Sequence, residues 1–224
     1  MRTRSSYSVV MVRVRGAGVV ALLGVLLFWA GVFTAGALLD GYSAVEDYIS
    51  SLAGRGSPVA VLGVAAFLAS TTAHLATSFL VLTVWRSRLA AGSVLLAGVA
   101  VAAVAVFRTS CPRGPAGCGV TDTSAGDWID TIHGLSVGAY QLFTMAAMLT
   151  LAVGSLRGLE TWPRWLGLTS LAFVIASMIL VSQLAGEMVG LWQRLWVATN
   201  LTWLLVAAWA ATRHDPAGLR PAHG

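Results

Sequence analysis

Six long apolar stretches, separated by short polar segments, occupy most of the chain. Each has the roughly 17–25 residues that a helix needs to cross about 30 Å of hydrocarbon. No alternation of polar and apolar residues competes for these stretches as strands, and an open sheet cannot satisfy its backbone in lipid. The pattern therefore predicts an all-α fold, a polytopic membrane helix bundle with six transmembrane helices. The predicted spans are Ala17–Leu39, Pro58–Val84, Leu89–Phe107, Ile129–Val153, Trp165–Leu184 and Leu191–Ala211.

The arginines give this bundle a direction. The chain has fourteen arginines and no lysine, and alternating the segments across the membrane places ten of them on the side of both termini. Because basic residues collect on the cytoplasmic side, we predict that both termini are cytoplasmic and that the protein lies in the cell (cytoplasmic) membrane. The predicted organisation is a basic N-terminus at 1–16, one transmembrane domain at 17–211 and a cytoplasmic tail at 212–224.

Two alternatives stay open at the N-terminus. The first span follows an arginine-rich start and ends in Ala35-Gly36-Ala37, as a cleaved signal peptide would. Its apolar run exceeds the 7–15 residues of a signal core, which favours a retained membrane helix. Met11, which precedes a second arginine-rich stretch, is an alternative start to Met1.

Composition excludes several classes of protein. With 57% hydrophobic and 10% charged residues, the chain has too few polar side chains to cover a soluble domain, so the expected partner is the lipid bilayer. The net charge of +5 describes a basic rim attracted to anionic lipid, and no aromatic-studded basic groove indicates nucleic-acid binding. The sequence also lacks a Walker loop, an H-E-x-x-H helix and a G-x-S-x-G elbow.

The two histidines within the spans lie at different depths. His133 is about one turn below the outer surface, whereas His74 is about 24 Å down its helix. A catalytic zinc site needs three clustered protein ligands, and the other two histidines are in the C-terminal tail. We therefore expect no metal and no cofactor.

Cys111 and Cys118 enclose a turn rich in proline and glycine, between the third and fourth predicted spans. On the oxidising side of a membrane such a pair is most simply a disulfide, which stabilises a short loop by about 2–3 kcal/mol. The alternative is a redox-active or metal-binding pair. However, the spacing does not fit C-x-x-C, and no histidine lies nearby.

Polar residues recur at helical spacing inside three spans, which places them on faces that look into the bundle. Such stripes either hold helices together or line a polar cavity. They comprise Ser70, Thr71, His74, Thr77 and Ser78 in the second span, Asp130, His133, Tyr140, Gln141 and Thr144 in the fourth, and Gln193, Arg194 and Asn200 in the sixth.

Ionisable residues converge at the outer face, because the first outer loop, at 40–57, can fold back over the ends of the later spans. There we predict catalytic roles for Asp130, His133 and Asp47, with His133 as the general acid or base and a carboxylate orienting it. Substrate-binding roles are predicted for Ser50, Arg108, Glu187 and Arg194, since arginines hold phosphates and carboxylates. We expect Asp47, His133 and Arg194 to share one vestibule. The structural alternative is a set of salt bridges that tie the loop to the bundle.

These residues also carry a resemblance to a known family. The pieces are Asp-x-Tyr-Ser…Asp-Tyr-Ile-Ser-x-Leu-Ala-Gly after the first span, the Cys-Pro…Gly-Cys loop, Asp-x-x-His-Gly at the fourth span and Gly-Leu-Trp-Gln-Arg-Leu at the sixth. Together they resemble the bacterial membrane-protein family called domain of unknown function 998, over roughly Ala17 to Ala211. The resemblance implies a six-helix membrane fold and brings no established reaction. Family members often have a second His after the His-Gly pair, where this chain has Val137 and Tyr140.

Three classes of function fit these observations. The first is an enzyme that acts at the outer leaflet on a lipid or polyprenyl-type substrate. The second is a small transporter, whose route the polar stripes would line. The third is a non-catalytic subunit or scaffold, which would require a membrane-protein partner or a second copy of the chain.

The arginine distribution predicts which loops are accessible from outside. Single cysteines at Ser57 or Ala125, in a variant lacking the native pair, should react with an impermeant thiol reagent in intact cells. Labelling only after the membrane is opened would show that the orientation is opposite to the predicted one.

The cysteine pair predicts a second accessibility result. In intact, unreduced cells neither Cys111 nor Cys118 should be alkylated, and both should become reactive after reduction. A double serine variant should still insert, because the bond would only close a short loop. Equal alkylation of both thiols without reductant would count against the disulfide.

Overall fold

Each predicted span forms a helix in the computed structural model, which describes residues 4–110, 128–158 and 162–214. The six long helices confirm the all-α prediction. They are α1 (Arg4–Leu38), α2 (Ala60–Val84), α3 (Arg88–Val106), α4 (Trp128–Leu156), α5 (Arg164–Ser182) and α6 (Val189–Arg213), with the short 3₁₀ helices η1 (Ile49–Ala53) and η2 (Gln183–Ala185). At 1.5 Å per residue, the 19 residues of α3 or α5 span about 28 Å, which matches a hydrocarbon core.

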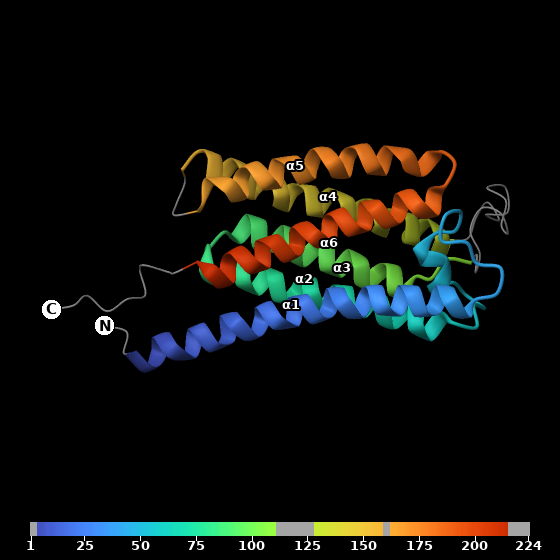
Figure 1. Ribbon diagram of the computed structural model, residues 1–224, viewed down its shortest axis with the longest axis horizontal. Coiled ribbons are helices and arrows are strands. Elements are labelled where there is room, and N and C mark those ends of the chain that lie inside the picture. Colours follow the sequence, from blue (N-terminus) through green and yellow to red (C-terminus); the bar gives the residue numbers. More distant parts are fainter. Residues whose placement is uncertain (1–3, 111–127, 159–161, 215–224) are drawn as a thin grey trace.

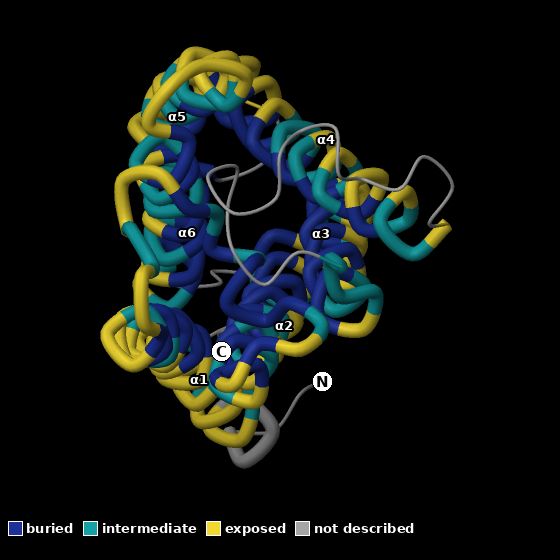
Figure 2. The backbone as a smooth tube through the Cα atoms, turned by 90° about the vertical axis from the view of Figure 1, so that its right-hand side faces the viewer, coloured by how far each residue is buried: buried dark blue, intermediate teal, exposed yellow. Residues whose placement is uncertain are grey.

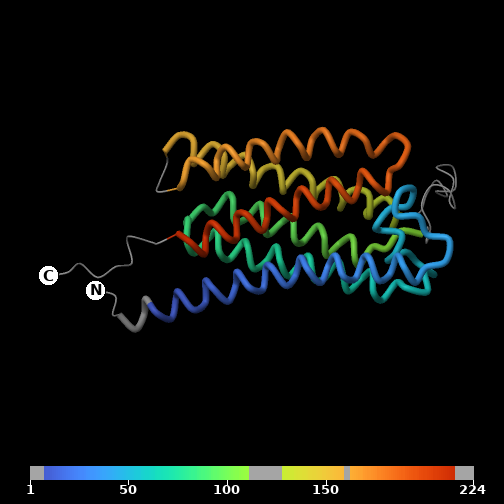
Figure 3. Tube along the Cα trace, in the orientation of Figure 1, coloured from blue at the N-terminus to red at the C-terminus, as the bar shows by residue number. Residues whose placement is uncertain are grey.

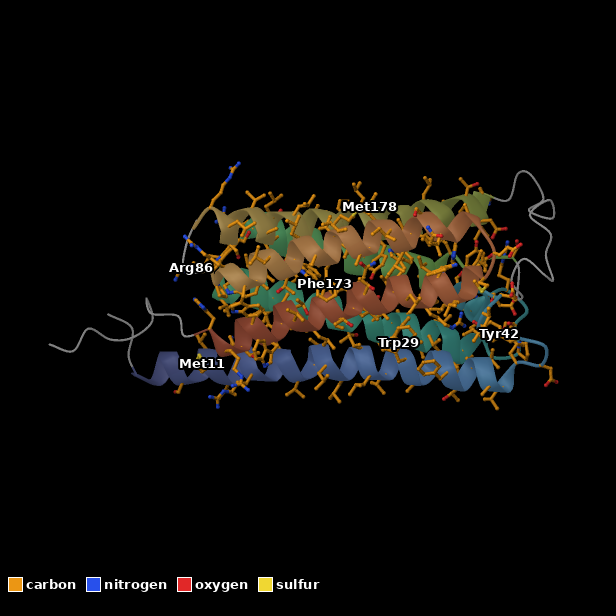
Figure 4. All side chains as sticks on the ribbon, turned by 45° about the horizontal axis from the view of Figure 1, so that its top comes forward. Met11, Trp29, Tyr42, Arg86, Phe173 and Met178 are labelled. Carbon is orange, nitrogen blue, oxygen red and sulfur yellow. The ribbon has the colours of Figure 1, made fainter. Side chains whose placement is uncertain are left out.

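The helices run alternately up and down, so the segments that connect them lie at two opposite ends of the bundle (Figure 1). The start of α1 and the end of α6 lie at one end, here called the terminal end, together with Met11 and Arg86, while Tyr42 lies at the opposite, loop end (Figure 4). Helices that follow one another in the chain pack together, and α6 returns to contact α1 and α2. The helices therefore form a closed ring when viewed from the loop end (Figure 2).

The outer surface of this ring is apolar. Val61 is 82% exposed, and Leu142 and Phe33 are 64% and 63% exposed. Water would not tolerate such a continuous apolar surface, whereas lipid chains solvate it. All six helices are long and apolar enough to cross a membrane by length and composition. The chain is thus a multi-pass membrane protein in contact with a lipid bilayer.

The interior contrasts with this surface because small residues let the helices approach closely. Ala21 and Ala73 are fully buried, and a Cβ atom at Gly24 would lie only 2.6 Å from the carbonyl oxygen of Ala69 on α2. Lipid provides no hydrophobic force between helices, so close van der Waals packing of this kind holds them together.

The first helix begins well before the predicted Ala17, since α1 starts at Arg4. Nothing between residues 4 and 16 breaks a helix, and exposed arginines such as Arg13 and Arg15 are good helix formers. The hydropathy pattern marks where lipid ends, and the helix continues past that point. Its buried face, which includes Val25 and Phe28, is part of the bundle core.

Residues 39–59, here called the docked loop, fold back over the loop end of the bundle (Figure 3). Within this loop η1 is buried, with Ile49 2% exposed and Leu52 fully buried. The N–H of Leu191 on α6 donates to the carbonyl oxygen of Val45 over 3.0 Å. Gly190 permits this approach, because a Cβ atom there would lie 2.5 Å from the Asp47 carbonyl oxygen.

This close backbone contact predicts a stability difference between two glycines. Gly190→Ala should destabilise the protein by about 1–3 kcal/mol, because only backbone movement can relieve the overlap. Gly138→Ala is the matched control, since Gly138 is also helical and has open space around its Cβ position. Alanine favours a helix at both positions, so the control should be neutral or slightly stabilised. Thermal unfolding in detergent would measure the two effects, and equal melting temperatures would contradict tight docking.

Candidate functional site

Arg194, in the second turn of α6, fastens the docked loop to the bundle. Its Nη1 donates to the carbonyl oxygens of Asp47, over 3.0 Å, and of Gly190, over 2.8 Å. Its Nη2 donates to the hydroxyl of Tyr42, and its guanidinium lies 5.4 Å from the centre of that ring. The planar guanidinium of Arg194 thus makes several hydrogen bonds at fixed angles. A lysine ammonium, which lacks this planar geometry, could not reproduce them.

Asp47 supports the same contact from inside the loop. It is 3% exposed, and its carboxylate accepts a hydrogen bond of 2.7 Å from the backbone N–H of Ser43. Its own N–H donates to the carbonyl oxygen of Ser43 over 2.8 Å, which closes a tight turn. The sequence analysis expected Asp47 and Arg194 to lie close together, and they are in contact. The contact is a hydrogen bond from Arg194 to the backbone carbonyl oxygen of Asp47.

Tyr42 stays protonated in this setting. Burial raises the pKa of its phenol above the ordinary value of 10.0, although the charge of nearby Arg194 opposes the shift. The neutral hydroxyl accepts from Arg194 and donates to the carbonyl oxygen of Tyr48 over 3.2 Å. The phenol therefore links the arginine to the chain just before η1.

Gln193 makes the adjoining contact. Its side-chain Oε1 accepts a hydrogen bond of 2.5 Å from the backbone N–H of Ile49, the first residue of η1. We call the set formed by Tyr42, Asp47, Gly190, Gln193 and Arg194 the loop latch. It connects consecutive residues of α6 with the segment that covers the bundle interior.

Asp130, in the first turn of α4, serves a second joint. Its carboxylate accepts from the backbone N–H of Ser110 over 2.7 Å and from the hydroxyl of the same serine. Arg55 of the docked loop lies 3.9 Å away, with its side chain 34% exposed. An ion pair this exposed contributes at most about 1 kcal/mol, so the hydrogen bonds to Ser110 are the stronger part of the joint.

His133 lies one turn further along α4 and is also engaged with the end of α3. Its Nδ1 is 2.8 Å from the carbonyl oxygen of Phe107. A carbonyl only accepts, so Nδ1 carries the proton and the neutral ring keeps Nε2 as an acceptor. His133 is buried and satisfies one of the carbonyls that a helix end leaves open.

The remaining predicted residues occupy different surroundings. Ser50 lies in η1 and lines a cavity, Arg108 follows α3 and is half-exposed, and Glu187 is exposed in the turn before α6. Cys111 and Cys118 lie outside the described residues. The recorded contacts thus group Asp47 with Arg194, and Asp130 and His133 with the end of α3.

A cavity of about 50 Å³ lies directly beneath the docked loop. Five of the six long helices and η1 contribute to its wall, which is mostly aliphatic and aromatic. The lining residues are Phe28, Ile49, Ser50, Phe67, Ser70, Val101, Val104, Val137, Tyr140, Gln193, Trp196 and Val197. None of them is charged, and neither His133 nor Asp130 is among them.

Ser50, Ser70 and Gln193 contribute polar side chains to this lining. Ser70 is 3% exposed and Gln193 is 8% exposed. A ligand or water that meets such buried polar groups lowers the cost of their burial. The cavity therefore combines an apolar wall with a few neutral hydrogen-bonding groups, as small-molecule sites do.

Below the cavity, four side chains from three helices form a polar network. The indole Nε1 of Trp196 donates to Oε1 of Gln141 over 2.7 Å. The hydroxyl of Ser177 on α5 donates to Oδ1 of Asn200 over 2.9 Å and lies 3.2 Å from the Gln141 amide. Each such bond contributes about 0.6 kcal/mol in a bilayer, so the network fastens α4, α5 and α6 together.

Apart from Ser70, the polar stripe of α2 makes hydrogen bonds within the protein. The hydroxyls of Thr71 and Thr77 donate to carbonyl oxygens one turn earlier on the same helix, over 3.1 and 2.9 Å. Nδ1 of His74 lies 2.8 Å from the carbonyl oxygen of Ser70. These contacts favour the structural interpretation of the stripe over a polar route.

Two contributors were not named as candidates from the sequence. Tyr42 lies in an ordinary loop, and Ser177 is one small hydroxyl in an otherwise apolar span. The signal for both was indirect. Arg194, Gln141 and Asn200 carry more donors and acceptors than their own helices can satisfy, so each requires a partner from another segment.

Comparisons with known proteins agree with this architecture. The family model described as a protein of unknown function (DUF998) matches residues 22–210. No curated protein and no solved structure matches the chain. The match begins in the membrane part of α1 and ends in α6, so it covers the docked loop, the latch and the cavity. The chain therefore belongs to the DUF998 family of proteins of unknown function.

Proposed function

We propose that this protein binds a lipid-like amphiphile, of the isoprenoid or acyl type, in the cavity beneath the docked loop. The observation that carries this proposal is the pairing of an uncharged, mostly apolar wall with the polar side chains of Ser50, Ser70 and Gln193. A ligand with a hydroxyl or carbonyl beside a hydrocarbon chain meets both requirements. A charged head group would find no opposite charge in the wall.

The size of the cavity limits what it holds. About 50 Å³ is several times the 10–15 Å³ that one water needs, but it is well below the 150 Å³ of an engineered cavity that binds benzene. We infer that the cavity holds the hydroxyl or carbonyl group of the ligand together with a few neighbouring carbons. The rest of the chain would lie between helices or in the bilayer.

The surroundings of Asp130 and His133, two of the predicted catalytic residues, support a binding function in preference to a catalytic one. Asp130 is committed to Ser110, and the Nδ1 proton of His133 is committed to the Phe107 carbonyl. Both residues join α4 to the end of α3, away from the cavity lining. The loop latch supports the same proposal, because it holds Ser50 and Ile49 over the cavity.

Transport is the second candidate, and one observation favours it. Tyr140 and Trp196 line the cavity, and Trp196 also belongs to the polar network below it. A route from the loop end would pass these two side chains. The network would then have to exchange its internal hydrogen bonds for bonds to the cargo.

Filling the cavity predicts a loss of binding. The protein in lipid nanodiscs would be exposed to a long-chain alcohol that carries a photoactivatable diazirine, and labelled residues would be mapped by mass spectrometry. We expect labels on lining residues such as Val137 and Val197. Val104→Trp should abolish them, because Val104 is 5% exposed and lines the cavity.

The control lies two residues away on the same helix. Val106 is 69% exposed, so Val106→Trp faces lipid and should leave cavity labelling unchanged. Ser70→Ala should weaken labelling about fivefold, equivalent to one hydrogen bond of about 1 kcal/mol, whereas Ser93→Ala should not. Labelling confined to lipid-facing residues, or unaffected by Val104→Trp, would contradict the proposal.

A further inference from the structure

Two grooves of nearly equal volume lie at the terminal end, and only one of them has a charged lining. The α1–α6 groove, of about 460 Å³, is lined by Arg15, Gly18, Val19, Leu22, Leu205, Ala208, Trp209 and Thr212. The α3–α4 groove, of about 440 Å³, is lined by Ser87, Leu89, Leu149, Thr150, Val153, Gly154 and Trp162. We propose that the α1–α6 groove binds one anionic phospholipid.

The rim of this groove is basic from both helices. Arg15 of α1 lines it and is exposed. On α6, the guanidinium of Arg213 lies 5.6 Å from the ring centre of Trp209, whose indole is 53% exposed and also lines the groove. Among the described residues, no carboxylate belongs to the lining. Guanidinium groups bind phosphate in a bidentate manner, and tryptophan favours the membrane interface, so this rim suits a lipid phosphate.

The floor of the groove suits the first part of an acyl chain. A Cβ atom at Gly18 would lie 2.6 Å from Cγ2 of Thr212, so α1 and α6 touch beneath the rim. From there the lining becomes wholly apolar along Val19, Leu22 and Leu205. Leu22 lies seven residues beyond Arg15, about 10 Å along the helix axis. The groove therefore begins with a cationic rim and continues as an apolar floor. A phospholipid has the matching order, with its phosphate at the membrane surface and its acyl chains deeper.

The α3–α4 groove shows why charge, rather than space, decides the occupant. It has a similar volume, and its lining includes one tryptophan, one serine and one threonine. Among the described residues, its lining contains no arginine. A neutral phospholipid should occupy either groove equally well. Each basic side chain at a membrane surface strengthens binding of an anionic lipid about fivefold, so the preference should be confined to the α1–α6 groove.

Native mass spectrometry of the full chain in detergent tests the proposal. The protein would be titrated with phosphatidylglycerol and with phosphatidylcholine of identical acyl chains. We expect one phosphatidylglycerol to be retained about 25-fold more tightly than phosphatidylcholine, because two arginines take part. Arg15→Gln with Arg213→Gln should remove this preference while leaving phosphatidylcholine binding unchanged.

Matched variants locate the lipid. Val19 is 56% exposed, so Val19→Trp should fill the α1–α6 groove without disturbing the core and should lower retention of phosphatidylglycerol. Leu89→Trp and Arg88→Gln make equivalent exposed changes at the α3–α4 groove and should have no effect. A large excess of inorganic phosphate should not displace the lipid, because phosphate cannot replace the acyl contacts.

Three results would overturn the proposal. The first is an equal preference for phosphatidylglycerol in the double arginine variant and the unaltered protein. The second is loss of the bound lipid on addition of inorganic phosphate, which would reduce the site to an anion site. The third is a lipid-free dimer that Val19→Trp dissociates, which would make the groove an interface between two copies of the chain. None of these results depends on the cavity at the loop end.

Discussion

The constraint on which this structure depends is that hydrocarbon offers no hydrogen bonds. A polar group placed at membrane depth is therefore stabilised chiefly by a partner within the protein. Arg194 shows the consequence clearly, because its two terminal nitrogens donate to two backbone carbonyls and the Tyr42 hydroxyl. Gly190 on α6 supplies one of these acceptors, and the other two are present only when the chain folds back between α1 and α2. The docked loop therefore stabilises the half-buried arginine, and the arginine in turn fixes the loop.

The same constraint explains how much of the fold could be predicted. Long apolar runs in a chain that must satisfy its backbone allow only helices, so all six spans followed from hydropathy. The start of α1 did not, because hydropathy marks the edge of lipid and the helix continues beyond it to Arg4. For the segment that contains η1, the sequence predicted only that the first loop can fold back over the bundle. The burial of η1 depends on Gly190 and on long-range contacts that no local pattern contains.

The candidate site could be predicted by residue type more readily than by role. Asp47 and Arg194 were expected together because both are ionisable at one depth, and they are in contact. The Asp130–His133 spacing suggested a catalytic pair, yet each side chain bonds to the end of α3. Spacing along one helix says which residues share a face. It does not say which neighbouring segment offers the better partner across that face.

The two ends of the bundle meet the constraint in opposite ways. At the loop end, the returning chain supplies backbone acceptors, and a few neutral polar side chains such as Ser70 and Gln193 line the cavity. At the terminal end, no described segment covers the helices in this manner, and arginines at exposed positions hold the polar boundary. A neutral cavity suits hydrocarbon with a hydroxyl or carbonyl, whereas an open basic groove suits a phosphate on a lipid. The ligands that we propose for the two ends differ for this reason.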